Sequence, residues 1–252
     1  MNSGYFKTQD YTTLHYRVTG VGQNNIIILH GGLGDSREMS IIIDNLDQEY
    51  FRLIQMDFRG HGRSYHGEKN LDYNLYADDV FALMDELKIE TASVVGYSDG
   101  ATTGLVMAYK QPDRIKTVVA ISPDTGIAGW TEGTNLDHTF EELASIEEMR
   151  ADYQSISPEP EKFHQLLKRV KALWQSEIHL EIEKLKDIKA FCWIVGSESD
   201  EFIKKEDLDL IQKKIPNSDK YLFFDLKHGE LAPSVAELSI GNDHVLTSIL
   251  KG

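Results

Sequence analysis

The sequence contains one cysteine and no long run of apolar residues. Because Cys192 is the single cysteine among 252 residues, a disulfide framework within the chain is excluded. Its apolar surroundings, Phe-Cys-Trp-Ile-Val, predict a small buried side chain. No apolar run approaches the ~18 residues of a membrane-spanning helix, and the first residues lack the apolar core of a signal peptide. We therefore expect a cytoplasmic protein.

Basic residues are also scarce. Lysine and arginine number 26 against 41 aspartates and glutamates, which gives a formal charge of −15. A charge of this sign repels the phosphates of nucleic acids and anionic lipids, so we expect neither nucleic acid nor membrane as a partner. The chain also lacks His-Glu-x-x-His, a cysteine cluster, Gly-x-Gly-x-x-Gly and a Walker lysine. We expect a small-molecule substrate and no metal or other cofactor.

Short apolar runs alternate with helical patterns along most of the chain. Strands separated by helices favour right-handed crossovers and a mostly parallel sheet. An alternating strand at 13–19 is typical of a sheet margin, and the run at 26–29 of a strand covered on both faces. Further strands are predicted at 51–57, 92–96, 117–122, 190–196 and 220–226, and helices at 73–87, 101–109, 204–215 and 235–250.

The alternation stops between residues 124 and 189. This segment is charged and helix-favouring and has no strand pattern. We expect one domain, residues 1–252, with a helical lid inserted at about 124–189. Trp130 and Trp174 lie in the insertion. They either line a substrate pocket or pack the lid onto the core, and the sequence favours neither.

The stretch Gly96-Tyr97-Ser98-Asp99-Gly100 lies between a predicted strand and a predicted helix. A tight turn there holds the serine in a strained backbone conformation, and its neighbours must be small to avoid strand and helix. The hydroxyl is then exposed at the carboxyl end of the sheet, beside a helix N-terminus that favours developing negative charge. We predict that Ser98 is a nucleophile, the alternative being a glycine-rich structural turn.

A serine nucleophile needs a base, and a neutral imidazole is the usual one. The chain has nine histidines. His228 follows a predicted strand in a loop where catalytic groups can converge, and we assign it as the base. His244 lies in the predicted terminal helix and is more typical of a surface residue.

The acid that orients the imidazole should also follow a strand. The loop Gly-Ser-Glu-Ser-Asp-Glu offers Glu198, Asp200 and Glu201. We favour Asp200, because its short side chain precedes an apolar Phe-Ile pair that can anchor the loop, and Glu198 remains the alternative. The chain order of the predicted triad is then Ser, Asp, His, with the insertion between the first two.

With these residues in place, the chain resembles the α/β-hydrolase fold superfamily along nearly its whole length. The resemblance rests on the serine turn, on LHGGLGDS (29–36), on MDFRGHGRS (56–64) and on VGSESDEF (195–202). It implies a mostly parallel sheet with helices on both faces, a helical lid and a serine hydrolase with Ser98, His228 and Asp200 as its triad. Asp200 lies four positions after Gly196, one further than the commoner spacing of the superfamily, which keeps Glu198 open.

The resemblance also implies an oxyanion hole. One backbone N–H would come from Asp99 and one from the loop around His30, with Gly32 first and Leu33, which would also line the substrate pocket, second. Two such donors can contribute on the order of 3 kcal/mol each to transition-state stabilisation. His30 is expected to brace the loop, and structural or surface roles are expected for three residues of the second motif: Arg59, His61 and Arg63.

Asp99 admits two interpretations. A carboxylate in the first turn of a helix compensates the helix dipole by a few tenths to about 1 kcal/mol. The Ser-Asp-Gly step is also similar to that of the valacyclovir hydrolase-like branch of the superfamily, which prefers α-amino acid esters. That resemblance implies that the carboxylate faces the pocket and pairs with a cationic substrate.

These residues predict a serine hydrolase that cleaves a small carboxylic ester through an acyl-enzyme intermediate. An amidase or aminopeptidase, a carbon–carbon hydrolase, an acyltransferase or a cofactor-free perhydrolase would use the same residues. A ligand-binding protein that keeps the triad as part of a receptor pocket is the non-enzymatic alternative. Substrate choice lies in the lid and the loops, so the sequence leaves these alternatives open.

Overall fold

A computed structural model describes residues 2–238 and 245–251. These residues form an eight-stranded sheet in the order β1-β2-β4-β3-β5-β6-β7-β8. Strand β2 is antiparallel to β1 and β4. The other strands, β3 to β8, are parallel to one another. The predicted fold class is therefore confirmed. The strands are β1 Asn2–Lys7, β2 Thr13–Thr19, β3 Asn24–Leu29, β4 Phe51–Met56, β5 Ala92–Tyr97, β6 Ile115–Ile121, β7 Phe191–Ser197 and β8 Ser218–Phe223.

The margin of the sheet differs from the prediction. The strand predicted at 13–19 is β2, and it lies one strand in from the edge because β1 pairs along its length, from Asn2 opposite Val18 to Lys7 opposite Thr13. The N-terminal strand was missed because its side chains are mostly exposed and Phe6 is its one buried residue. A short helix, α1 (Ser40–Asp44), was also not predicted.

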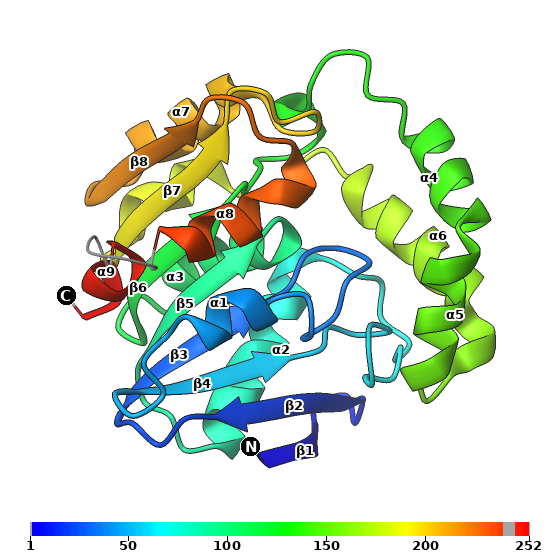
Figure 1. Cartoon of the computed structure of the whole chain (residues 1–252), viewed down its shortest axis with the longest axis horizontal. Helices are drawn as coiled ribbons and strands as arrows, with labels where there is room; N and C mark the ends of the chain where they lie inside the picture. Colours follow the sequence, from blue (N-terminus) through cyan, green and yellow to red (C-terminus); the bar gives the residue numbers. More distant parts are fainter. Residues whose placement is uncertain (1, 239–244, 252) are drawn as a thin grey trace.

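Helices cover both faces of the sheet (Figure 1). Helices α2 (Tyr73–Glu86), α3 (Asp99–Lys110) and α7 (Lys205–Lys214) contribute to one apolar cluster, and α1, α8 (Leu231–Glu237) and α9 (Val245–Lys251) to a second. The predicted terminal helix at 235–250 is represented by α8 and α9, while residues 239–244, with His244, lie outside the described residues. None of the helices in the described part has the length and hydrophobicity that crossing a bilayer requires.

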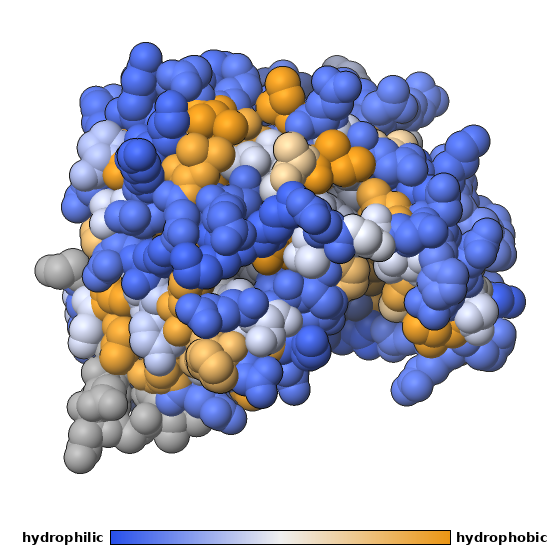
Figure 2. Space-filling model, turned by 90° about the horizontal axis from the view of Figure 1, so that it is seen from above, coloured by the Kyte–Doolittle hydropathy of each residue, from blue (hydrophilic) through white to orange (hydrophobic). Residues whose placement is uncertain are grey.

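Between β6 and β7 the chain forms three α-helices, α4 (Leu136–Ser145), α5 (Glu147–Ile156) and α6 (Phe163–Trp174), and three short 3-10 helices, η1 (Ile127–Gly129), η2 (Pro160–Lys162) and η3 (Ile182–Asp187). Figure 1 shows α4, α5 and α6 set to one side of the sheet, beyond the carboxyl ends of its parallel strands. We call residues 124–189 the cap segment, and its action as a lid stays a prediction. Hydrophilic residues cover most of the face in Figure 2, in keeping with the charge of the chain.

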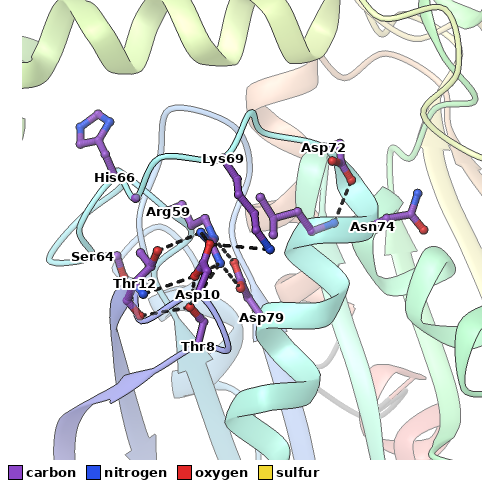
Figure 3. Close-up of polar contacts among 12 residues, drawn as sticks. Thr8, Asp10, Thr12, Arg59, Ser64, His66, Lys69, Asp72, Asn74 and Asp79 are labelled. Atoms are coloured by element: carbon purple, nitrogen blue, oxygen red, sulfur yellow. Dashed lines mark hydrogen bonds and ion pairs between the residues drawn. The ribbon is translucent and has the colours of Figure 1, made fainter.

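The loop after β4 is held by a buried ion-pair cluster (Figure 3). The guanidinium of Arg59, 1% exposed, donates to both carboxylate oxygens of Asp79 on α2, at 2.6 and 2.7 Å. It also donates to both carboxylate oxygens of Asp10, in the turn between β1 and β2, at 2.7 and 3.0 Å. Arg59 is thus a structural residue, and it is buried rather than on the surface. The cluster fixes the loop that carries His61.

Candidate active site

Ser98 lies in a strained turn between β5 and α3. Its φ of 51° is in the left-handed region that residues with side chains rarely adopt. A Cβ on Gly96 would lie 2.2 Å from the Gly100 carbonyl oxygen, and a Cβ on Gly100 would lie 2.4 Å from that of Leu29. Both contacts are with backbone, so neither position accepts a side chain. This explains why glycines flank the serine on both sides.

The structure brings the three residues of the predicted triad together. The Nε2 atom of His228 lies 3.1 Å from the Ser98 Oγ, and its Nδ1 lies 2.9 Å from the Asp200 Oδ2. A carboxylate accepts hydrogen bonds, so this pair assigns the imidazole proton to Nδ1 and leaves the Nε2 lone pair facing the serine. Burial alone would raise the pKa of Asp200, but the hydrogen bond and charge of His228 hold that pKa below its ordinary value.

The other two acids of the loop after β7 have different places. Glu198 is exposed at the surface, whereas Asp200 is buried against His228. Glu201 accepts a hydrogen bond at 2.9 Å from the backbone N–H of His228, and the hydroxyl of Tyr97 donates to the carbonyl of the same residue at 3.1 Å. These two bonds fix the backbone that carries the imidazole.

One neighbour of the triad was not predicted. Ser122 follows β6, and its hydroxyl donates to Asp200 Oδ2 at 2.6 Å and lies 3.3 Å from His228 Nδ1. Its position was the available signal, because the carboxyl ends of neighbouring parallel strands meet at one edge of the sheet. No motif marks it, so the sequence analysis passed over it.

The loop after β3 is positioned by two buried histidines. His30 Nδ1 donates to the carbonyl of the next residue at 2.7 Å, and its Nε2 accepts from the N–H of Phe58 at 3.0 Å. His61 Nδ1 donates to the Arg59 carbonyl at 3.0 Å, and its Nε2 accepts from the N–H of Leu33 at 3.2 Å. Burial, with the proximity of His30, lowers the pKa of His61 to about 3, so its ring stays a neutral acceptor.

Because His61 takes the N–H of Leu33, Gly32 is the candidate oxyanion donor of this loop. The second candidate is the N–H of Asp99, the first residue of α3, where helix geometry leaves the amide without a partner inside the helix. A Cβ on Gly32 would lie 2.5 Å from the Trp174 ring and 2.7 Å from the Asp99 carboxylate. The absence of a side chain therefore lets the loop approach the serine turn.

A cavity of about 450 Å³ opens beside Ser98 and His228. Its wall includes all four side chains that the sequence proposed for substrate contact: Leu33, Asp99, Trp130 and Trp174. The two tryptophan rings are 5.7 Å apart, and both belong to or pack against the main apolar cluster. They therefore hold the cap segment on the core and line the cavity at once.

The cavity is acidic. Its lining in the described part of the chain includes four carboxylates and no lysine or arginine, and the acids are Glu38, Asp99, Asp124 and Glu201. The Asp99 carboxylate accepts the Tyr73 hydroxyl at 2.9 Å and the Trp174 indole N–H at 2.9 and 3.1 Å. Burial and the charge of Asp124, opposed by the Tyr73 bond, raise the pKa of Asp99 to about 6.

A buried histidine compensates part of this charge. His179 Nδ1 pairs with the Asp124 carboxylate, and its Nε2 faces the Leu173 carbonyl at 3.1 Å. Burial would lower the pKa of His179, but the hydrogen bond and charge of Asp124 raise it. Two acceptors facing one ring favour the imidazolium. Among residues 2–238 and 245–251, no three His, Cys, Asp or Glu side chains are arranged to hold a metal ion.

Comparison with protein families matches residues 24–151, half of the chain, to the α/β-hydrolase fold. The human serine hydrolase BPHL is 33% identical over 110 residues, which make up 42% of this chain and 38% of that protein. A putative esterase/lipase of Haemophilus influenzae is 29% identical over 96 residues, 38% of this chain and 33% of that protein. The matched region thus spans less than half the length of these curated relatives.

Solved structures of low sequence identity share the fold over nearly the whole chain. An esterase from Exiguobacterium antarcticum matches with a TM-score of 0.78 at 18% identity, covering 98% of this chain and 99% of that one. The enol-lactonase from Burkholderia xenovorans matches with a TM-score of 0.74 at 20% identity, covering 99% and 100%. At these identities the likeness concerns the fold alone.

Proposed function

Because the chain belongs to the α/β-hydrolase family, we propose that it is a serine hydrolase that cleaves a small carboxylic ester through an acyl-enzyme intermediate. The observation that carries the proposal is the continuous contact from Ser98 Oγ through the His228 imidazole to the Asp200 carboxylate. Nucleophile, base and orienting acid are thereby within hydrogen-bonding distance, as this chemistry requires.

In the first half of the reaction, Ser98 Oγ attacks the ester carbonyl carbon and its proton passes to His228 Nε2. The N–H groups of Gly32 and Asp99 stabilise the oxyanion of the tetrahedral intermediate. The carbon–oxygen bond to the alcohol then breaks, and the leaving alcohol takes the proton from His228. In the second half, His228 deprotonates a water that attacks the acyl-enzyme, and Ser98 leaves with that proton as the acid is released.

The substrate that fits best carries a positive charge near its acyl group. Asp99 is next to the nucleophile, and Asp124 lines the same cavity. Part of the hydrogen-bonding capacity of Asp99 is used by Tyr73 and Trp174, and its remaining lone pairs can accept an ammonium. This favours an α-amino acid ester over a neutral one. The cap segment, which supplies Trp130 and Trp174 to the cavity wall, acts as a lid over the acyl group of the substrate.

The test is a panel of p-nitrophenyl esters of graded acyl length beside aminoacyl esters, with the Ser98→Ala variant as control. We expect turnover by the wild type, with higher kcat/KM for the aminoacyl esters, and none by the variant. Equal activity in both proteins would show that another residue does the chemistry. Preference for neutral esters would retain the hydrolase and reject the cationic substrate.

A further inference from the structure

Ser122 is a buried serine in a strained conformation beside the triad. It is 1% exposed, and its φ of 54° lies in the left-handed region, as does that of Ser98. The two serines occupy equivalent places, one directly after β5 and the other directly after the neighbouring strand β6. A glycine would adopt this φ without strain. The backbone conformation alone therefore does not explain why this residue is a serine.

The polar atoms of Ser122 account for its position. Its backbone N–H donates to the Val195 carbonyl on β7 at 2.7 Å. Its Oγ lies 2.6 Å from Asp200 Oδ2, and an ionised carboxylate can only accept, so the hydroxyl proton points to Asp200. Because the same oxygen also accepts from His228 Nδ1, hydroxyl and imidazole converge on one carboxylate atom.

Asp200 is thereby held from both sides. Its second oxygen, Oδ1, accepts the N–H groups of Phe202 and Ile203 at 2.9 and 3.1 Å. These amides belong to the loop that carries Asp200 and move with it, whereas Ser122 directly follows β6, a strand in the interior of the sheet. Of these donors, the Ser122 hydroxyl is the one that ties the carboxylate to a rigid strand end.

We propose that Ser122 is a positioning residue of the hydrolase, a fourth member of the hydrogen-bonded chain that acts on Ser98 through Asp200 and His228. Its hydroxyl fixes the carboxylate in the orientation that holds the imidazole proton on Nδ1 and the Nε2 lone pair on the nucleophile. The inference rests on the proposed function. Its specific content is that the hydroxyl, rather than the shape of residue 122, is required for turnover.

The experiment compares Ser122→Gly, which removes the hydroxyl and the backbone strain together, with Ser122→Ala, which removes the hydroxyl alone. Ser93→Ala is the matched control, because Ser93 is 6% exposed and lies on β5 at the end away from the site. The measured quantities are kcat and KM for the best ester of the panel and the melting temperature. The low-field proton NMR resonance of His228 Nδ1–H reports on the hydrogen bond itself.

Both Ser122 variants should lose about 10- to 100-fold in kcat, the range for a hydrogen bond to a charged group, with KM within about twofold of wild type. Their His228 Nδ1–H resonance should shift, whereas Ser93→Ala should match the wild type in every readout. A Ser122→Gly protein that melts at or above the wild-type temperature and keeps wild-type kcat would overturn the proposal. So would a loss of kcat with an unshifted resonance.

These outcomes are separate from those of the proposed function. A wild-type protein that hydrolyses no ester and leaves Ser98 unmodified by a fluorophosphonate refutes the hydrolase itself. An active wild type with an equally active Ser122→Gly variant refutes only the role of Ser122. Because the glycine variant relieves strain, the test does not depend on whether Ser122→Ala folds.

Discussion

Substituting Asp99 with asparagine tests whether the cavity recognises a positive charge on the substrate. The two side chains have the same shape, and the asparagine oxygen can still accept the Tyr73 hydroxyl and the Trp174 indole N–H, which bond to the carboxylate at 2.9 Å. The backbone N–H of residue 99, the candidate oxyanion donor, is retained. What Asp99→Asn removes is the negative charge beside Ser98.

The magnitude follows from the burial of this carboxylate. Opposite unit charges 4 Å apart attract by about 4 kcal/mol at an effective dielectric constant of 20, before desolvation is subtracted. Net values for hydrogen bonds to charged groups are about 1.5–3 kcal/mol. We therefore expect Asp99→Asn to lower kcat/KM for an aminoacyl ester by about 10- to 100-fold, and for the matched ester without the amino group by less than about twofold.

The pKa of Asp99, raised to about 6 chiefly by burial, adds a pH dependence. An acid with this pKa is about nine-tenths ionised at pH 7 and about one-tenth ionised at pH 5, while the substrate amine becomes more protonated. The ratio of kcat/KM for the charged ester to that for the neutral one should fall severalfold between pH 7 and pH 5. Because both esters need the same catalytic groups, the titration of those groups cancels in the ratio.

The assay is initial-rate kinetics of the two esters for wild type and Asp99→Asn at both pH values. In the variant the ratio of kcat/KM for the charged ester to that for the neutral one should be low at pH 7 and should not fall further at pH 5. An equal loss of kcat/KM for both esters would refute a role for Asp99 in recognising substrate charge. It would assign Asp99 to the general structure of the site or to the dipole of α3.

Three further changes test the surroundings of the site. Arg59→Met should destabilise the protein by about 3–5 kcal/mol in urea unfolding because it leaves the Asp79 carboxylate buried and unpaired. Burial raises the pKa of Asp79 to about 6 although Arg59 opposes the rise, so the acid should protonate more readily in the variant and the deficit should shrink as the pH falls. A loss under about 1 kcal/mol would contradict the pairing. His61→Ala should lower kcat by about 10-fold with little change in KM, because the Leu33 N–H loses its acceptor and the oxyanion loop loosens; unchanged kcat would mean that the loop holds itself. Gly100→Ala should abolish activity or folding, since its Cβ meets backbone at 2.4 Å, and a stable, fully active variant would disprove that packing.

The parallel strands were predictable because each is a short apolar run next to a helical pattern. The bounds of the strands predicted at 26–29 and 92–96 lie within one or two residues of those of β3 and β5. The edge strand β1 has almost no buried side chain, so its pairing with β2 left no hydrophobic pattern to read. Local pattern thus identified the parallel strands and missed the exposed N-terminal strand.

The site divides in the same way. Ser98, His228 and Asp200 were proposed from the sequence because each follows a predicted strand and has a chemistry that the others need, and the structure places them within hydrogen-bonding distance. Ser122 was missed because a single serine after a strand is a weak signal. The assignment of Leu33 and Gly32 depends on His61, 28 positions further along the chain, and only three-dimensional structure brings that acceptor to the loop.

The most direct measurement for the whole account is covalent labelling by a fluorophosphonate, read by intact mass and peptide mapping. We expect one adduct per chain on the peptide that contains Ser98, none in Ser98→Ala, and a much slower reaction in His228→Ala. An unlabelled wild type, or an adduct on a different residue, would contradict the assignment of Ser98 as the activated nucleophile.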